Sequence, residues 1–190
     1  MSPLEITAVV FYLASVLLTI KKNVWFWPTG IVAVSCYLFL FFREKLYADM
    51  ALQLVYLAQS FYGWYFWYKT GLREDKRDIG ELSGGKFLLS FLITGVLTVF
   101  TWYFLVNFTD GSLPFWDATA TALSLMANFL LSRKIMQNWI YWIMADVVYI
   151  ALFFYKELYL SSFIYFIFLF LAIGGYLKWK KELLPNKVSF

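Results

Sequence analysis

The chain has 190 residues, of which 62% are hydrophobic, 23% aromatic and 15% charged, and its net charge is +4. A soluble domain usually has about a quarter of its residues charged and about half apolar, so this composition excludes a water-soluble globule and predicts an integral membrane protein. The chain has no histidine and a single cysteine, Cys36. These counts exclude imidazole-dependent catalysis, histidine-based metal sites and an internal disulfide. We expect no metal ion, no cofactor and no nucleic-acid partner.

Seven mostly apolar runs are long enough to span a bilayer, which takes about 20 residues: 4–20, 24–42, 46–68, 87–106, 113–132, 139–155 and 158–177. The first run has no cleavage site of the signal-peptide kind, so we expect it to remain as a helix. The fifth run is the least hydrophobic, because polar residues such as Asp117 and Asn128 interrupt it. We retain it as a span, since polar residues inside a membrane usually face the helix bundle or a water-filled cavity.

The third and fourth runs are separated by residues 69–86, which are rich in glycine and charged side chains. This composition predicts a solvated linker. The basic residues also segregate between the two sides that seven spans would create. One side carries only Arg43, Lys45 and Lys156, and the other carries the remaining thirteen of the 16 lysines and arginines. By the positive-inside rule, the N-terminus is outside and the C-terminus is in the cytoplasm.

Three sequence blocks recur in the same order, at a separation that changes only from 115 to 112 positions. The matched blocks are Asn23–Trp27 with Asn138–Trp142, Phe42–Tyr47 with Phe154–Tyr159, and Tyr62–Trp67 with Gly174–Trp179. Such recurrence predicts a duplicated three-helix unit. Because one span lies between the two copies, both have the same orientation in the membrane, as in transporters built from parallel repeats.

The predicted fold class is therefore an all-α integral membrane protein, with seven transmembrane helices in a 3+1+3 parallel-repeat arrangement. Residues 1–68 form the first repeat, residues 69–112 the cytoplasmic loop and the connecting helix, and residues 113–190 the second repeat and a cytoplasmic tail. Transporters of this architecture place their substrate near the middle of the membrane, between the two halves.

Asp146 is the one acidic residue placed well inside a predicted span. A central Asp costs about 2.5–3.5 kcal/mol on insertion scales, so it indicates a functional site. Helical spacing puts it on one face with Trp139, Trp142, Tyr149 and Phe153. An acid within an aromatic stripe suits a flat, cationic ligand, because ring faces attract cations. The alternative is a structural Asp that is hydrogen-bonded to a neighbouring helix.

Polar residues also recur at helical spacing in two other spans. They include Gln53, Tyr56 and Gln59 in the third span and Ser124 and Asn128 in the fifth. Each can be either a ligand contact or a hydrogen bond between helices. The tryptophans near the span ends are typical of an interfacial aromatic belt, although Trp27 and Trp116 can instead cap a cavity. These belt candidates are Trp25, Trp27, Trp64, Trp67, Trp116 and Trp179.

These segments together resemble the PnuC family of nicotinamide riboside transporters. The resemblance covers nearly the whole chain, from about residue 5 to Trp179, and is carried by Tyr47–Tyr56, Tyr62–Trp67, Asn138–Tyr149 and Lys156–Tyr159. It implies a bacterial inner-membrane importer with a 3+1+3 arrangement like that of the SWEET sugar transporters. It further implies facilitated diffusion, with the substrate trapped by a cytoplasmic vitamin kinase that phosphorylates it.

Carried over by position, the resemblance implies six substrate-binding residues: Gln53, Tyr56, Asn128, Trp142, Asp146 and Tyr149. The amides suit the nicotinamide carboxamide, the acid suits the ribose hydroxyls, and the aromatic rings suit the cationic pyridinium. The family resemblance leaves a homo-oligomer open. Little sequence precedes the first span, so we expect no N-terminal regulatory element.

Several alternatives remain at this level. Relatives carry thiamine or riboflavin, and an ion-coupled transporter follows if Asp146 titrates. An intramembrane aspartyl enzyme needs a second nearby acid, and the sequence offers only Asp49, at the edge of the third span. A seven-helix receptor or scaffold has no evident use for a parallel repeat. We therefore expect a transporter and no enzymatic activity.

Overall fold

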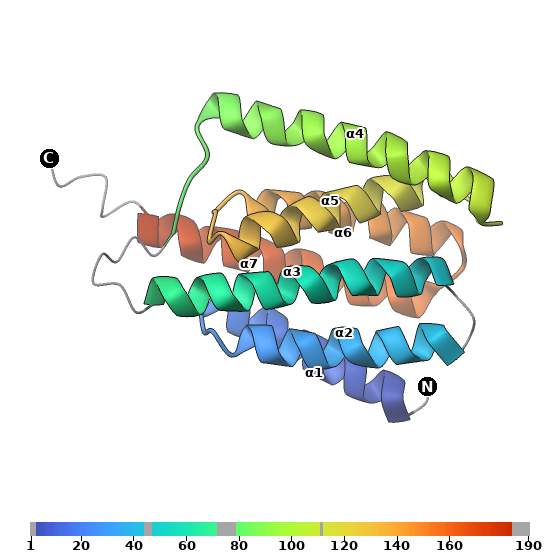
Figure 1. Ribbon diagram of the computed structural model, residues 1–190, viewed down its shortest axis with the longest axis horizontal. Helices are drawn as coiled ribbons and strands as arrows, with labels where there is room; N and C mark the ends of the chain where they lie inside the picture. The colour runs from blue at the N-terminus through green and yellow to red at the C-terminus, as the bar shows by residue number, and fades with distance from the viewer. Residues whose placement is uncertain (1–2, 44–46, 72–78, 111, 184–190) are drawn as a thin grey trace, which may run out of the picture. The chain divides into compact units, whose positions relative to one another are not determined.

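The computed structural model describes residues 3–43, 47–71, 79–110 and 112–183, and these ranges form α-helices joined by short connections (Figure 1). The helices are α1 Pro3–Ile20, α2 Phe26–Arg43, α3 Tyr47–Gly71, α4 Gly84–Phe108, α5 Pro114–Ser132, α6 Asn138–Tyr155 and α7 Tyr159–Leu183. All seven predicted runs are thus confirmed as helices. Residues 44–46, the middle of the predicted linker at 72–78 and the predicted tail from residue 184 lie outside the described residues.

The helix α7 extends six residues past the predicted end of its apolar run, to Leu183. Its last turn contains Lys180 and Lys181, and cations at this position interact favourably with the negative end of the helix dipole. The lysines mark the end of the apolar run in the sequence, but the helix continues through them.

Within the described residues, α2, α4, α6 and α7 are long and apolar enough to cross a membrane by length and composition. Helix α1 contributes a shorter apolar stretch, Ile6–Ile20. Helices α3 and α5 are not among these candidate spans, and α3 is the less hydrophobic of the two, so the expectation that the fifth run is the least hydrophobic is wrong. Most residues of α5 between Ala118 and Ser132 are buried within the protein. A helix that is covered by protein has no need of an apolar surface toward lipid.

The chain divides into two compact units. The amino-terminal unit comprises residues 1–78 together with Ser132–Lys134, and the carboxy-terminal unit comprises residues 79–131 together with residues 135–190.

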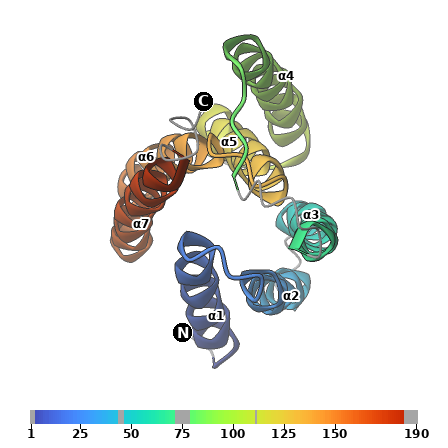
Figure 2. The ribbon, with the colours of Figure 1, turned by 90° about the vertical axis from the view of Figure 1, so that its left-hand side faces the viewer.

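In the amino-terminal unit, α2 packs against both α1 and α3 (Figure 2). Its centre is an aromatic cluster in which Trp27 of α2 lies against Gly63 and Trp67 of α3, with the two indole rings 6.2 Å apart and nearly perpendicular. Phe26 completes the cluster, 4.8 Å from the Trp67 ring. The Trp67 ring is covered in turn by the Lys134 ammonium group at 4.8 Å. We call Trp27, Gly63 and Trp67 the first tryptophan–glycine brace.

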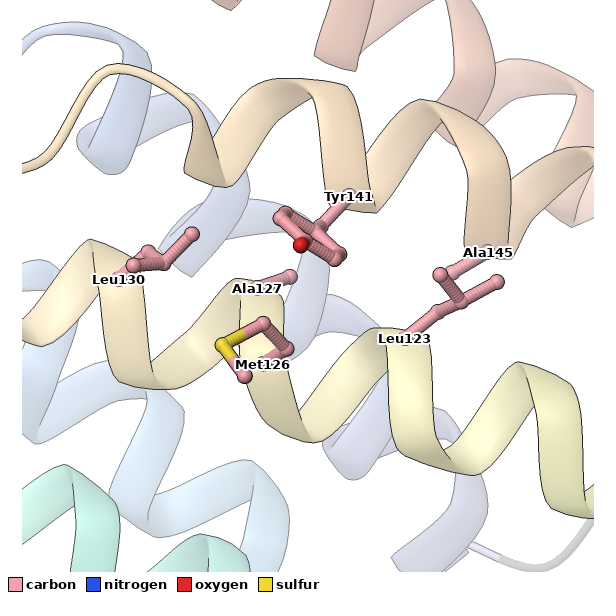
Figure 3. Close-up of a cluster of buried hydrophobic side chains, with 6 residues drawn as sticks. All are labelled: Leu123, Met126, Ala127, Leu130, Tyr141 and Ala145. Carbon is pink, nitrogen blue, oxygen red and sulfur yellow. The ribbon is translucent and has the colours of Figure 1, made fainter. Parts of the chain in front are cut away.

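In the carboxy-terminal unit, α5 and α6 pack through a buried cluster (Figure 3). Its members are Leu123, Met126, Ala127, Leu130, Tyr141 and Ala145. Two of these residues are alanines, and small residues are common where helices associate within a membrane. Helix α4 joins this pair through the buried Ser90 and Tyr141 hydroxyl groups, whose oxygens are 2.7 Å apart.

Helix α7 packs along α6 in the same unit. Trp139 of α6 lies against Gly175 and Trp179 of α7, and the two indole rings are 5.5 Å apart at 88°. We call these three residues the second tryptophan–glycine brace. Each of its members stands 112 positions after its counterpart in the first brace.

The helix ends repeat at the same separation. Lys22 and Lys134 follow α1 and α5 and have the same left-handed backbone φ of 54°. The hydrogen bonds that close these ends also correspond: Asn23 N–H donates to the Leu18 carbonyl and Ile135 N–H to the Leu130 carbonyl, each at 3.0 Å. The recurrence of three blocks in the sequence is thus matched by local backbone geometries and side-chain contacts that recur at 112 positions.

The structure corrects two details of the sequence interpretation. The match of Asn23 with Asn138 is wrong by three positions, because the structural counterpart of Trp27 is Trp139. Three tryptophans that were expected in the interfacial belt are instead buried, Trp27 at 2% exposure, Trp67 at 3% and Trp179 at 0%. They pack face to edge with other rings inside their own units, and this contact depends on a partner helix that the sequence pattern does not reveal.

Candidate functional site

Asp146 lies in the middle of α6 and is buried, with 4% of its surface exposed. Among the described residues, its carboxyl group has no hydrogen-bond partner and no neighbouring cation. A carboxyl group removed from water without a partner is costly to the fold. Such a group is retained where something else, such as a ligand, supplies the missing interaction.

Tyr149 follows Asp146 by one helical turn and carries the site toward α5. Its side chain lies close to the side chains of Thr121 and Ser124 on α5. It also lies within electrostatic range of the carboxyl groups of Asp117 and Asp146. The polar stripe predicted on the fifth span and the aromatic stripe predicted on the sixth therefore come together at Tyr149.

The Tyr149 ring is also part of an aromatic stack. Tyr165 of α7 lies 4.5 Å from it at an interplanar angle of 32°, and Phe153 lies 5.8 Å from it at 15°. The Tyr165 and Phe153 rings are 5.3 Å apart at 25°. Three rings from two helices thus present nearly parallel faces beside the site. Parallel aromatic faces are suited to a flat ring, and their electron-rich surfaces favour a cationic one.

Two further predicted residues belong to the same unit. Asn128 is buried on α5, one turn beyond Ser124, with 9% of its surface exposed. Trp142 lies on α6, one turn before Asp146, and packs against the buried α5–α6 cluster. Four of the predicted site residues, Asn128, Trp142, Asp146 and Tyr149, therefore lie on two helices that pack directly together.

The other two predicted residues, Gln53 and Tyr56, lie in the amino-terminal unit on α3. They are separated by three positions and so share one face of that helix, and both are half-buried. The Tyr56 carbonyl accepts a hydrogen bond of 2.8 Å from the Ser60 hydroxyl.

Trp139 does not belong with the ligand stripe in which helical spacing placed it. Its ring is 2% exposed and is taken up by the second brace, against Gly175 and Trp179. It fixes α6 against α7, which leaves Trp142, Tyr149 and Phe153 as the aromatic candidates of that stripe.

An ion pair stands beside the site. The Lys156 ammonium group donates to both carboxylate oxygens of Asp117, at 2.9 and 3.1 Å. Lys156 caps the C-terminus of α6 and Asp117 lies in the first turn of α5. The pair thus ties together the two helices that carry the site.

The described residues contain no group of three or more acidic or cysteine side chains that could hold a metal ion. One uncompensated carboxyl group, hydroxyl and amide groups, and stacked aromatic rings are groups suited to binding a small polar ligand. This combination is typical of a small-molecule binding site within a multi-pass membrane protein, such as a transporter.

Comparison with known proteins agrees with this class. Residues 2–181 match the protein family described as nicotinamide mononucleotide transporter. The chain is 30% identical over 176 residues to the nicotinamide riboside transporter PnuC of Escherichia coli (strain K12), covering 79% of this chain and 73% of that protein. It is equally similar to PnuC of Shigella flexneri. PnuC of Neisseria mucosa is 23% identical over 166 residues, which cover 80% of this chain and 62% of that protein.

The fold has a counterpart of known structure. A crystal structure of the vitamin B3 transporter PnuC aligns with a TM-score of 0.74 and 25% sequence identity, covering 94% of this chain and 80% of that one. The chain belongs to the nicotinamide mononucleotide transporter family.

Two contributions to the site were missed from sequence. Tyr165 is one of many aromatic residues in α7, and no periodicity distinguishes it from its lipid-facing neighbours. The pairing of Asp117 with Lys156 joins residues 39 positions apart, so only the packing of α5 against α6 reveals it. Thr121 and Ser124 did give a signal, since they lie in the polar stripe of the fifth span.

Proposed function

We propose that this chain carries nicotinamide riboside across the membrane by facilitated diffusion. The observation that carries the proposal is Asp146, a buried carboxyl group with no partner among the described residues, next to stacked aromatic rings. Nicotinamide riboside is a flat monocation with ribose hydroxyl groups. Its pyridinium ring matches the aromatic faces, and its hydroxyl groups or positive charge can supply the interaction that Asp146 lacks.

The same chemistry favours the riboside over the mononucleotide. A phosphate group needs cationic or backbone N–H partners. In the carboxy-terminal unit, the one described cation that adjoins the site is Lys156, and it is already paired with Asp117.

The remaining features of the proposal extend this transport role. The recurrence at 112 positions supports a 3+1+3 arrangement of parallel, SWEET-like repeats, with residues 1–68 and 113–190 as the repeats and residues 69–112 between them. In such an arrangement Gln53 and Tyr56 contribute to the substrate site from the first repeat. The distribution of basic residues supports an N-terminus outside and a C-terminus in the cytoplasm of a bacterial inner membrane.

Facilitated diffusion alone equalises concentrations, so net uptake needs a step that removes the substrate inside the cell. Phosphorylation by a cytoplasmic vitamin kinase is the step that fits, because the added negative charges would be incompatible with an acidic site whose described residues offer no free cation. The proposal therefore pairs this transporter functionally with such a kinase.

Calorimetric titration of the purified protein with nicotinamide riboside, nicotinamide mononucleotide, thiamine and riboflavin tests the substrate. We expect the riboside to bind most tightly. Asp146→Asn should weaken that binding at least tenfold, as expected for a hydrogen bond to a charged group, whereas Asp110→Asn, at an exposed position before α5, should leave it unchanged. Tighter binding of thiamine, or an unaltered affinity of the Asp146 variant, contradicts the proposal.

Uptake into proteoliposomes tests the mode of transport. For facilitated diffusion, the initial rate of riboside uptake is the same with and without an imposed proton gradient. A rate that rises with the gradient would instead indicate an ion-coupled transporter in which Asp146 takes part in proton transfer.

A further inference from the structure

The ion pair between Asp117 and Lys156 is more than a link between helix ends. Both side chains are partly exposed, at 29% and 25%, and pairs of this exposure contribute little to stability. Each charge is also favoured at its own position, Asp117 by the positive start of the α5 dipole and Lys156 by the negative end of the α6 dipole. The fold therefore has no strong need for the pair itself.

The location of the pair suggests a different role. Tyr149, at the centre of the site, is within electrostatic range of two carboxyl groups, those of Asp117 and Asp146. Lys156 binds both oxygens of Asp117 and so compensates its charge. No described cation compensates Asp146. Of the two acids next to Tyr149, one is thus neutralised and one is left available.

We propose that Lys156 is a specificity-determining residue, which neutralises Asp117 so that the site offers a single available acid to a singly charged substrate. This inference rests on the proposed transport of a monocation. Without Lys156, the site would present a second acid and would hold a cation too firmly to release it. Without Asp117, the unpaired ammonium group of Lys156 would repel the cation.

A charge cycle tests the proposal, using the full-length protein with the variants Lys156→Gln, Asp117→Asn and the combination of both. Binding of nicotinamide riboside is measured by calorimetry, and the KM and maximal rate of uptake are measured in proteoliposomes. We expect Lys156→Gln to lower Kd and KM by about three- to tenfold, from Coulomb attraction at an intermediate dielectric constant, and to lower the maximal rate because release slows. Asp117→Asn should raise Kd and KM by a similar factor.

The double variant separates charge from structure. If charge balance is what matters, removing both charges restores Kd and KM to within about twofold of wild type, since the net charge beside Tyr149 is again the same. If the pair is only a brace, both single variants and the double variant lose binding alike, and the proposal is overturned.

The variant Lys156→Arg provides a second comparison that does not depend on the folding of the Asp117 variants. It keeps the charge and should keep the wild-type Kd and KM, and identical behaviour of Lys156→Gln and Lys156→Arg would overturn the proposal. Failure of the wild-type protein to bind nicotinamide riboside would overturn the proposed function and this inference together. Wild-type binding with equal losses in every variant would overturn the inference alone.

Discussion

The ring of Trp139 on α6 occupies the space that a side chain at Gly175 on α7 would need. A Cβ atom at position 175 would lie 2.5 Å from the Cη2 atom of that ring. The absence of a side chain at 175 therefore lets the two helices approach, and the buried indole fixes their spacing. Because Asp146 lies two helical turns beyond Trp139 on α6, this contact also sets where the site's carboxyl group stands relative to α7.

The first prediction concerns this contact. Gly175→Ala should lower the free energy of unfolding by about 1–3 kcal/mol, the usual cost of overpacking a filled interior. The adjacent variant Gly174→Ala is the matched control, because a Cβ there meets nothing within 4 Å, and its stability should be equal to or above that of wild type. Thermal unfolding in detergent measures both. Equal melting temperatures for the two variants would show that the Trp139 ring can move aside.

The second prediction concerns the equivalent contact of the amino-terminal unit. A Cβ at Gly63 would overlap the Trp27 ring, whereas one at Gly30 would make ordinary contact with Ser15 at 3.7 Å. Gly63→Ala should therefore lower the melting temperature as Gly175→Ala does, and Gly30→Ala should not. A loss at one brace without a loss at the other would contradict their structural equivalence.

The third prediction uses residues with a left-handed backbone. Glu157 follows α6 with φ at 59°, and its N–H and that of Leu158 donate to the carbonyls of Phe154 and Phe153, which is the helix end where glycine is preferred. Glu157→Gly should raise stability by about 1 kcal/mol, because glycine adopts this conformation without steric cost.

Lys134→Gly, at φ 54°, is the informative comparison. Glycine removes the steric cost of the left-handed backbone here too, but the substitution also removes the contact between the Lys134 ammonium group and the Trp67 ring, at 4.8 Å. A cation–π contact at an accessible site contributes about 0.5–1 kcal/mol. The two melting temperatures should therefore differ, with Glu157→Gly the higher. A gain for Lys134→Gly equal to that for Glu157→Gly would mean that the cation–π contact contributes nothing.

The fourth prediction concerns Gln137, whose side chain holds the segment before α4. Its amide oxygen accepts from Leu82 N–H at 3.0 Å and its amide nitrogen donates to the Leu82 carbonyl at 3.2 Å. A backbone bond of 2.8 Å from Met136 N–H to the Gly80 carbonyl runs beside it. Gln137→Ala should cost about 1–3 kcal/mol for two lost hydrogen bonds.

Gln137→Glu separates the two bonds. It can still accept from the Leu82 N–H but has no N–H to donate to the Leu82 carbonyl, so its stability should fall between those of wild type and Gln137→Ala. Limited proteolysis should cut the segment before α4 faster in the same order. Wild-type resistance in Gln137→Ala would show that this side chain does not secure the segment.

Several residues of the candidate site could be predicted from the sequence, because polar residues are rare within membrane-spanning segments. Asp146 and Asn128 interrupt apolar runs, where insertion is costly, and each is buried in the structure. Helical spacing also placed Tyr149 beside Asp146, and the two side chains lie within electrostatic range of each other. The same spacing misplaced Trp139, since 3.6-residue periodicity assigns a residue to a face but does not say which helix covers that face.

The sequence by itself determined that this protein is helical and membrane-embedded, where its seven helices run, and that three sequence blocks recur. These properties follow from hydropathy, chain length and local spacing, which act within one segment at a time. Only the tertiary structure decided which side chains meet across helices: the two tryptophan–glycine braces, the stack of Tyr149 with Tyr165, and the pairing of Lys156 with Asp117. Such contacts join residues tens of positions apart, and they depend on how closely two helix backbones can approach, which no single helix specifies.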